Sequence, residues 1–473
     1  MKFLVIMCDT MRADHLGCYG NDWIKTPNLD AFAREGVVFE RAYCGSWPTV
    51  PNRTDLFTGR YGEPLHPWVP LSREAVTLID VMRANEYVCH LILDTPHLMN
   101  YGFGFDRPFH SWWMIRGNEK DRFNSDWGAT EIGHARNRMV AERAVEQALY
   151  LKNTAGRTGE KDYFAPKVMC AAMDWLERNY KHEKFFLWVD CFDPHEPWDP
   201  PQHYVDPYDP EFVGEVPTNF FEDANITGRE LKQIRARYAG EVTMVDKWAG
   251  RVLRKLDELG IADETAVVVM SDHGTGLGDH GKIKKSTPIY EEVGRIVWLM
   301  RLPGSLQVRK RVKALVQPAD LMPTLLELAG IESPDFIQGS SVLSLIKGRR
   351  RKVRGIAVTG SMSVGRRAVE LTVTSERWSL IHPVRRGGWE LYDLKNDPRQ
   401  KKNVIAKHAA VAEDLHEKLL GWLAEHDAPE WLRGAYEKCE EVKDDESRIR
   451  SGYERHLGRK VGVPSWRVSF SDD

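Results

Sequence analysis

The sequence has no apolar stretch that approaches the ~20 residues a helix needs to cross a membrane. At the N-terminus, MKFLVIMCDTMRADHLG, Lys2 precedes an apolar run, but the run ends at Asp9. The small-residue cleavage site of a secretory leader does not follow it. We therefore expect a buried first strand, a cytoplasmic protein and no membrane partner.

Cysteine and net charge are also scarce. The seven cysteines are odd in number and lack CxxC spacing, which argues against a disulfide framework or a thiolate zinc site. The net charge of -3 gives no field that would gather nucleic acid. The basic run KGRRRKVRG at residues 347–355 contains no aromatic residues, and we interpret it as a solvated linker. The sequence predicts no nucleic-acid partner and leaves homo-oligomerisation open.

Apolar runs typical of buried strands alternate with helical patterns along the first part of the chain. Strands are expected at residues 3–8, 37–43, 87–94, 185–192 and 265–272, and helices at 26–36 and 229–259. This alternation predicts an α/β fold with a large sheet flanked by helices. At 473 residues, the chain is also long enough for a second domain.

The second part of the chain has a different pattern. Residues 368–382 and 389–394 alternate like antiparallel strands, and residues 410–426 form an amphipathic helical pattern. We expect a large α/β domain at 1–350, a small C-terminal α+β domain at 351–428 and a charged C-terminal extension at 429–473.

Residues with chemical potential gather at strand ends and at one helix start. Asp9 ends the first expected strand, and Asp272 with His273 ends the last. The carboxyl ends of strands in such sheets share one crevice, although each acid taken alone is better explained as a cap or turn residue. In AYCGSWPTVPNRTDLFTGRY, residues 42–61, Thr49 and Arg53 stand at an expected helix start, where unpaired N–H groups suit an oxyanion. Thr49 could also be an ordinary cap.

Several ordered motifs together resemble the sulfatase family of the alkaline phosphatase superfamily. They are DTMRADHLGCYG, TPNLDAFAREGVVFERAY, TVPNRTDLFTG, FDPHEPWDPP, SDHGTGLGDHG, PADLMPTLLELAGI and LYDLKNDPRQKKN. The resemblance implies an alkaline phosphatase-like fold and a metal ion held by Asp9, Asp272, His273 and Thr49. It implies that Arg53 holds the nucleophile and a substrate oxygen, and that His195 contacts the ester or its leaving group. Lys285 would bind the anionic oxygens, with Lys282 or Lys284 as alternatives.

The chain departs from the family at the nucleophile. The family signature begins with Cys or Ser, which is converted to formylglycine, whereas this chain has Thr49. The methyl group on the threonine Cβ would allow only a ketone, so no formylglycine is expected. Cys44 and Ser46 do not fit the spacing of the signature, which leaves Thr49 in register.

Two further departures concern the metal and the pocket. Thr10 stands where calcium-dependent sulfatases have a second Asp, which favours manganese, zinc or iron over calcium. We expect one divalent ion, because the spacing of Asp190, His195 and His382 does not support a second site. In LDTPH, Asp94 occupies the position of a sulfatase lysine, leaving Thr95 and His97 as substrate-binding candidates. An acid in place of a cation weakens the case for a sulfate ester.

These observations lead to three hypotheses. The first is a metal-dependent hydrolase of phosphodiesters or phosphonate monoesters, in which Thr49 attacks a small anionic ester. The second is a sulfate-ester hydrolase that works without formylglycine. The third is a catalytically silent protein that binds a sulfated or phosphorylated ligand. Retention of Asp9, Asp272, His273 and Arg53 beside Thr49 argues against the third hypothesis, because folding alone does not require this set.

Overall fold

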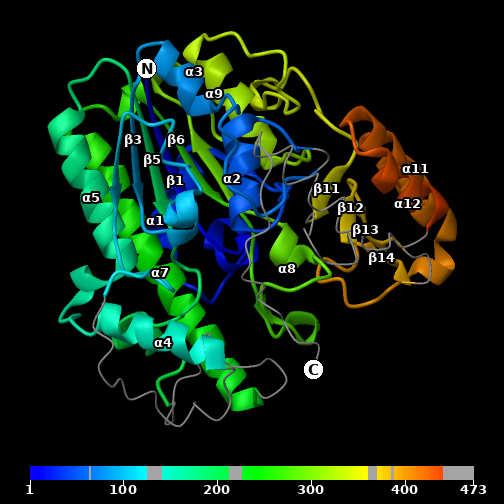
Figure 1. The fold of residues 1–473 in the computed structure, drawn as a ribbon, viewed down its shortest axis with the longest axis horizontal. Coiled ribbons are helices and arrows are strands. Elements are labelled where there is room, and N and C mark those ends of the chain that lie inside the picture. The colour runs from blue at the N-terminus through cyan, green and yellow to red at the C-terminus, as the bar shows by residue number, and fades with distance from the viewer. Residues whose placement is uncertain (63–64, 125–140, 212–225, 361–369, 385–387, 440–473) are drawn as a thin grey trace, which may run out of the picture.

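The computed structural model describes residues 1–62, 65–124, 141–211, 226–360, 370–384 and 388–439 (Figure 1). Its centre is an eight-stranded sheet with the order β10-β2-β9-β6-β1-β5-β3-β4. The strands are β1 (Lys2–Cys8), β2 (Val37–Phe39), β3 (Val88–Leu93), β4 (Ser111–Met114), β5 (Phe185–Cys191), β6 (Thr265–Ser271), β9 (Trp298–Arg301) and β10 (Lys310–Val312). β9 is antiparallel to its neighbours β2 and β6, and the other pairs are parallel. The expected α/β architecture is confirmed.

The central strands are apolar throughout because both faces of the sheet are covered. In β1, Phe3, Val5 and Met7 enter one core with α2 (Thr49–Thr58), α3 (Leu78–Ala84), α9 (Leu321–Ala329) and α10 (Leu343–Ile346). The alternate residues Leu4, Ile6 and Cys8 enter a second core with α1 (Pro27–Glu35), α5 (Phe164–Asn179) and α7 (Gly228–Glu258). Helices on both faces thus hold the strand ends in fixed positions (Figure 1).

The long helix α7 begins at a capping box, in which Thr227 and Glu230 satisfy each other's backbone N–H groups. Its bounds confirm the helix expected at 229–259. Four shorter elements complete this part of the chain: α4 (Ala141–Thr154), α6 (Gln202–Val205), α8 (Glu291–Gly294) and the β7–β8 hairpin (Gly276–Leu277 with Ile283–Lys284). The hairpin holds the glycine-rich turn just before Lys285.

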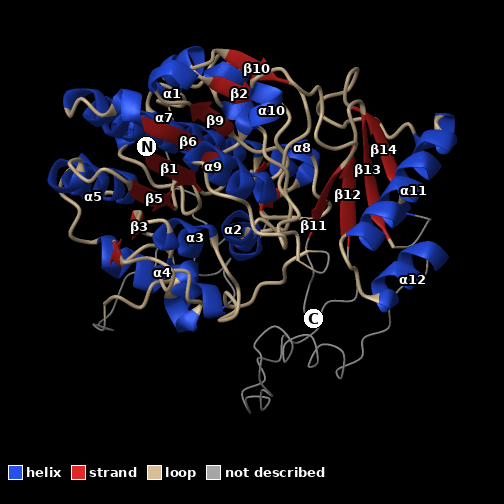
Figure 2. Cartoon of the chain, turned by 90° about the horizontal axis from the view of Figure 1, so that it is seen from above, coloured by secondary structure: helices blue, strands red, loops and turns tan. Residues whose placement is uncertain are grey.

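A second, antiparallel sheet has the order β11-β12-β13-β14 and lies to one side of the large sheet in both views (Figures 1 and 2). Its strands are β11 (Ala357–Gly360), β12 (Glu370–Thr374), β13 (Trp378–Pro383) and β14 (Glu390–Asp393), and α11 (Ala409–Glu425) and α12 (Glu430–Lys438) pack on it. The α+β character expected of this region is confirmed. The extension expected from residue 429 begins with α12, which the sequence pattern did not indicate. Within the described ranges, none of the helices has the length and apolar character required to span a membrane.

Candidate active site

Four neighbouring strands of the large sheet deliver polar groups to one edge. Asp9 follows β1, Asp272 and His273 follow β6, and Asp190 is the penultimate residue of β5. Thr95 follows β3 after one intervening residue. Since β6, β1, β5 and β3 are adjacent in the sheet, their carboxyl ends bring these side chains together, as the sequence predicts for the two acids and the imidazole.

Thr49 is the first residue of α2 and is fully buried. Its Oγ1 lies 3.5 Å from His273 Nε2 and accepts a hydrogen bond from Lys285 Nζ at 3.2 Å. A helix start also carries unpaired backbone N–H groups and the positive end of the helix dipole. The hydroxyl therefore lies where negative charge is stabilised.

The side chains of Asp9, Asp272 and His273 form a buried group whose potential ligand atoms all lie within 4.8 Å of one another. Asp9 Oδ1 is buried without a hydrogen-bond partner, and Asp272 Oδ2 is buried with an ion pair to Arg53 Nη1 at 2.8 Å. The His273 Nδ1–H group donates to the Gly274 carbonyl at 2.7 Å, so Nε2 presents its lone pair toward the carboxylates. An unpartnered carboxylate oxygen, a second buried carboxylate and an oriented imidazole fit a divalent ion that accepts nitrogen.

The electrostatics of these three residues indicate the same fit. Burial, and next the Asp272 carboxylate, raise the pKa of Asp9 well above its usual range. Burial also opposes ionisation of Asp272, but His273 and Arg53 hold its pKa below the usual range. Burial lowers the pKa of His273 to about 4, which leaves the imidazole neutral at pH 7. A cation between the carboxylates would remove the repulsion that keeps Asp9 from ionising.

Arg53, which the resemblance assigns to the nucleophile and a substrate oxygen, lies among the acids of the site. Its guanidinium is buried and bonded to Asp190 at 2.7 and 3.0 Å, and it forms ion pairs with Asp272 at 2.8 Å and Asp9 at 3.4 Å. Among the described residues, no hydrogen bond or ion pair joins this guanidinium to Thr49. Three carboxylates converge on this point of the sheet edge, and their attraction for the planar guanidinium outweighs any pull from a neutral hydroxyl.

Lys285 and His195 lie beside Thr49, as the resemblance implies. Lys285 Nζ is 2.8 Å from His195 Nε2 and bridges that ring to the threonine hydroxyl. The His195 Nδ1–H group donates to the Glu196 carbonyl at 2.5 Å, so Nε2 is the acceptor. Burial, followed by the Lys285 ammonium, lowers the pKa of His195 well below its usual range. Of the lysines at 282, 284 and 285, Lys285 is the one bonded to Thr49.

Thr95 and His97, the two predicted substrate-binding residues, have different partners. Thr95 Oγ1 donates to Asp190 Oδ1 at 2.7 Å and so helps to hold Asp190 in place for its pair with Arg53. His97 Nε2 lies 2.8 Å from Glu119 Oε2, a residue that sequence reasoning missed. The sequence gives no indication of Glu119, because this residue lies on a separate loop and has no recognisable spacing from the predicted site residues.

The structure corrects the interpretation of Asp94 as an acid facing the substrate pocket. Its carboxylate accepts hydrogen bonds from the Phe192 backbone N–H at 2.7 Å and from Asn118 Nδ2 at 2.9 Å. Burial, and then Asp193, raise its pKa well above the usual range. The side chain therefore joins two loops and adds no free acid to the pocket, so it does not count against an anionic ester as the sequence suggested.

The alternative nucleophiles and ligands have other partners. Ser46 Oγ donates to Asp55 at 2.6 Å, and Cys44 Sγ bonds the Ser46 carbonyl. Of the residues weighed for a second metal site, Asp190 is bonded to Arg53, and His382 lies in β13 with its Nε2 2.8 Å from His416. Asn52 was missed: it donates to the Asp272 carbonyl at 3.0 Å, and its Oδ1 is buried without a partner.

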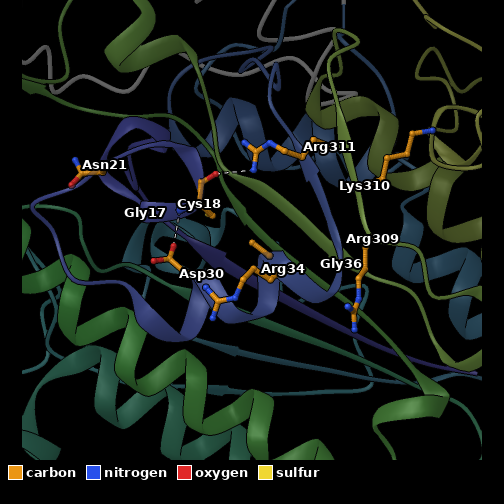
Figure 3. A pocket seen from close by; sticks show the side chains of 10 residues that line it. Gly17, Cys18, Asn21, Asp30, Arg34, Gly36, Arg309, Lys310 and Arg311 are labelled. Carbon is orange, nitrogen blue, oxygen red and sulfur yellow. Dashed lines mark hydrogen bonds between the residues drawn. The ribbon is translucent and has the colours of Figure 1, made fainter.

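A surface pocket beside α1 and β10 shares no lining residue with this site (Figure 3). Its cations are Arg34, Arg309, Lys310 and Arg311. Arg311 donates to the Cys18 carbonyl at 3.0 Å, and Lys310 donates to the Leu345 carbonyl at 2.8 Å. Two of the four cations thus hold neighbouring backbone.

Comparisons with known proteins agree with the geometry. The family model described as Sulfatase matches residues 2–331, and one described as N-sulphoglucosamine sulphohydrolase, C-terminal, matches residues 278–425. An arylsulfatase of Clostridium perfringens is 28% identical over 443 residues, covering 85% of this chain and 90% of that protein. The structure of a phosphonate monoester hydrolase of Agrobacterium radiobacter superposes with a TM-score of 0.72 at 21% identity, covering 90% of this chain and 96% of that one. A structure solved in complex with its substrate D-glucosamine-2-N,6-O-disulfate superposes with a TM-score of 0.71 at 20% identity, covering 90% of this chain and 99% of that one.

Proposed function

Because the chain belongs to the sulfatase family of ester hydrolases, we propose that it is a metal-dependent hydrolase of phosphodiesters or phosphonate monoesters with Thr49 as its nucleophile. The observation that carries this proposal is the position of the Thr49 hydroxyl. It lies at a helix start, 3.5 Å from a ring nitrogen of the Asp9–Asp272–His273 group and 3.2 Å from the Lys285 ammonium. Threonine cannot supply the aldehyde of formylglycine, but its hydroxyl can form a phosphate ester.

The charges around Thr49 match a singly charged ester. With a divalent ion bound, the ionised carboxylates of Asp9, Asp190 and Asp272 would carry three negative charges, against two positive charges on Arg53 and Lys285. His195 and His273 are neutral at pH 7, because burial lowers the pKa of both. The divalent ion would then bring the sum to one positive charge, which suits the monoanion of a phosphodiester or phosphonate monoester better than the dianion of a phosphate monoester.

The proposed ion would be held by Asp9, Asp272, His273 and Thr49, and manganese, zinc or iron suits this mixed oxygen and nitrogen set. When bound, such an ion supplies Lewis-acid charge to the ester and lowers the pKa of a hydroxyl nucleophile. Arg53 helps to form the metal site, because it pairs with both Asp9 and Asp272 and so keeps the two carboxylates close together.

The other residues act on the ester itself. Thr49 Oγ1 attacks phosphorus, the bond to the leaving alkoxide breaks, and the proton lost by the Thr49 hydroxyl ends on that leaving alcohol. Water then hydrolyses the phosphodiester or phosphonate ester formed on Thr49, which restores the hydroxyl and releases the second product. Lys285 lies over the Thr49 hydroxyl, so an ester oxygen that enters takes hydrogen bonds from its ammonium group. His195 accepts from Lys285 through Nε2 in the arrangement described above, and we assign it the role of orienting this lysine.

Sulfate-ester hydrolysis is the second candidate, because an arylsulfatase covers 85% of the chain at 28% identity. The test is a comparison of rates on aryl phosphodiester, phosphonate monoester, phosphate monoester and sulfate ester, after removal of metal and reconstitution with manganese, zinc, iron or calcium. We expect the first two esters to be hydrolysed fastest, with a transition metal. Faster sulfate turnover would favour the second candidate, and no turnover of any ester would favour a silent binding protein.

A further inference from the structure

The segment that carries Lys285 is a loop whose two ends meet. Lys285 lies five residues after His280, in the turn of the β7–β8 hairpin, and five residues before Tyr290. The His280 and Tyr290 rings are stacked, with their centroids 3.7 Å apart and their planes 6° from parallel. His280 Nδ1 is also 2.8 Å from Glu292 Oε1 at the start of α8. His280 therefore closes the loop, and Lys285 lies at its middle.

The same histidine joins the loop to the small domain. His280 Nε2 is 2.9 Å from the backbone carbonyl of Gln400, which follows β14. The Gln400 side chain accepts from the Glu291 backbone N–H at 2.6 Å, and the Tyr290 hydroxyl donates to Glu390 of β14 at 3.0 Å. Helix α8 accordingly lies beside the small sheet in both views (Figures 1 and 2). These contacts fix the closed end of the loop against the second sheet.

The backbone on both sides of this contact is strained. The φ angle is 49° at His280, 64° at Lys284 and 50° at Gln400, a left-handed conformation that few non-glycine residues adopt. Three of the eight such residues in the described part of the chain thus lie in this loop or against it. Lys284 directly precedes Lys285. Strained conformations persist where the surroundings determine the backbone, and they gather at functional sites.

The partners of His280 require a charged ring. A carboxylate and a backbone carbonyl only accept hydrogen bonds, so both ring nitrogens must carry a proton for both bonds to form. Burial opposes the charge, but the Gln400 carbonyl and the Glu292 carboxylate raise the pKa of His280 above its usual value of 6.5. The His280 and Glu292 side chains are only 18% and 8% exposed, so solvent screens their attraction only in part.

Other charged groups around the ring favour its charge or are screened. Asp279, the preceding residue, acts to raise the pKa of the imidazole and is itself paired with Arg12 at 2.6 Å. The cations nearest in sequence to the ring and to its carbonyl acceptor are Lys282, Arg399 and Lys401, and all three are exposed. Water and salt weaken the repulsion from such exposed charges. The ring and its two acceptors therefore decide how firmly the loop is closed.

We propose that His280 is a positioning residue that, as an imidazolium, closes this loop and so holds the Lys285 ammonium against the Thr49 hydroxyl. This inference rests on the proposed function, in which Lys285 binds the ester. When the ring loses a proton, one of its two acceptors has no donor, and one hydrogen bond instead of two holds the end of the loop. The loop is thus fully closed at low pH and loosens as the pH rises through the pKa of His280. Lys285 then spends less time beside Thr49, and ester binding weakens.

The test is the pH dependence of His280→Asn and Glu292→Gln, each loaded with the preferred metal. Asparagine tolerates the left-handed φ but has no charge, whereas glutamine keeps an acceptor and removes the negative charge. We measure kcat and KM on an aryl phosphodiester between about pH 5 and pH 9. Calorimetry gives the Kd of inorganic sulfate, whose charge is constant over this range. His182→Asn, which changes an exposed histidine, is the control.

In the wild type, kcat/KM should fall by roughly 10-fold as the pH rises through the pKa of His280, mainly through KM, as expected for the loss of one charge-assisted hydrogen bond. Glu292→Gln should move this fall to lower pH, because the carboxylate no longer stabilises the charged ring. His280→Asn should have the lower value at every pH and lack this fall. The affinity for sulfate should follow the same pattern, and His182→Asn should match the wild type.

A wild type without this fall, or variants whose profiles coincide with it, would overturn the proposal. A uniform loss in Glu292→Gln would do the same, because a merely structural contact lowers activity equally at every pH. If the wild type hydrolyses no ester, the proposed function fails, and the same pH shift in the sulfate Kd still supports the role of His280. If the metal-loaded wild type does not bind sulfate either, both are contradicted. Measuring Tm identifies unfolding, and if His280→Asn unfolds, the shift in Glu292→Gln decides.

Discussion

Thr49 differs from the serine or cysteine of the family signature by the methyl group on its Cβ. The methyl group blocks oxidation to an aldehyde but leaves the hydroxyl in the position described, between His273 Nε2 and Lys285 Nζ. The residue is fully buried at the start of α2, so the methyl group packs within the protein. As a helix cap its hydroxyl would contribute only ~1 kcal/mol to stability, whereas as a nucleophile it is required for turnover.

Thr49→Ala should therefore lower kcat/KM by at least about 10³-fold with little change in Tm, since it removes the attacking oxygen and leaves the helix. Thr49→Ser keeps the hydroxyl and should retain substantial activity. The measurement is steady-state kinetics on an aryl phosphodiester with the preferred metal. Full activity of Thr49→Ala would eliminate Thr49 as the nucleophile.

The metal prediction also concerns single residues. Purified protein should contain or bind about one equivalent of manganese, zinc or iron, because the group includes an imidazole. His273→Gln and Asp272→Asn should each reduce the bound metal, as measured by elemental analysis after dialysis. His382→Gln lies in the small sheet and serves as the control. Binding of calcium alone, or unchanged metal content in Asp272→Asn, would contradict the assignment.

The basic segment between α10 and β11 has an exposed part and a part that is held by an ion pair. Residues 347–352 are exposed or partly exposed, in keeping with a solvated linker. Arg354, in contrast, is paired with Asp320, whose carboxylate is buried and also accepts from the Gln317 and Ser340 backbone N–H groups. This ion pair fastens the segment to the start of α9.

Arg354→Ala should lower the free energy of unfolding by about 3 kcal/mol, because it leaves a buried carboxylate without its partner. Arg350→Ala, which removes an exposed cation from the same run, should change it by less than about 0.5 kcal/mol. Urea unfolding followed by circular dichroism measures both. Equal effects of the two substitutions would show that the ion pair adds nothing to stability.

Helices α1 and α7 are joined by a buried acid with a specific pH dependence. Asp246 of α7 accepts hydrogen bonds from the backbone N–H groups of Leu29 at 2.7 Å and Asn28 at 3.2 Å. Burial raises the pKa of Asp246 from 3.8 to about 6 despite these bonds. Folding thus favours the protonated form, and the stabilisation is full below pH ~4 and lost as the pH rises through 6.

Relative to Asp246→Asn, the wild type should lose about 2.4 kcal/mol of unfolding free energy between pH 4 and pH 7, most of the ~3 kcal/mol that the shift from 3.8 to about 6 allows at 1.36 kcal/mol per pKa unit. Unfolding in urea at each pH measures the difference between the two proteins, so that groups common to both cancel. Parallel curves for wild type and variant would refute the assignment.

The sequence predicts some elements much better than others, for physical reasons. β1, β5 and β6 are buried on both faces and appear as continuous apolar runs. β4 is an edge strand with Trp112 and Trp113 about half exposed, and β11 is only four residues long, so neither has a recognisable pattern. At the site, Asp9 and Asp272 were predictable because strand ends converge. Arg53's partners and Glu119 were not, because they depend on contacts between segments far apart in the chain.

Across the whole molecule, all seven cysteines are free thiols. Burial raises the pKa of most of them, for example that of Cys89 to about 12, so few can form thiolates. In the native protein, Ellman's reagent should react quickly with at most the three partly exposed residues, Cys18, Cys170 and Cys439. In denaturant it should react with all seven. Fewer than seven in the denatured, unreduced protein would reveal a disulfide.

The proposed function depends on a covalent step at Thr49, and mass spectrometry can observe that step. Protein reconstituted with its preferred metal is mixed with an aryl phosphodiester, quenched in acid within the first turnovers and digested. We predict a phosphoryl adduct on the peptide that contains Thr49 and none on that peptide from Thr49→Ala. Hydrolysis without an adduct, or an adduct on another residue in an active Thr49→Ala protein, would contradict this role for Thr49.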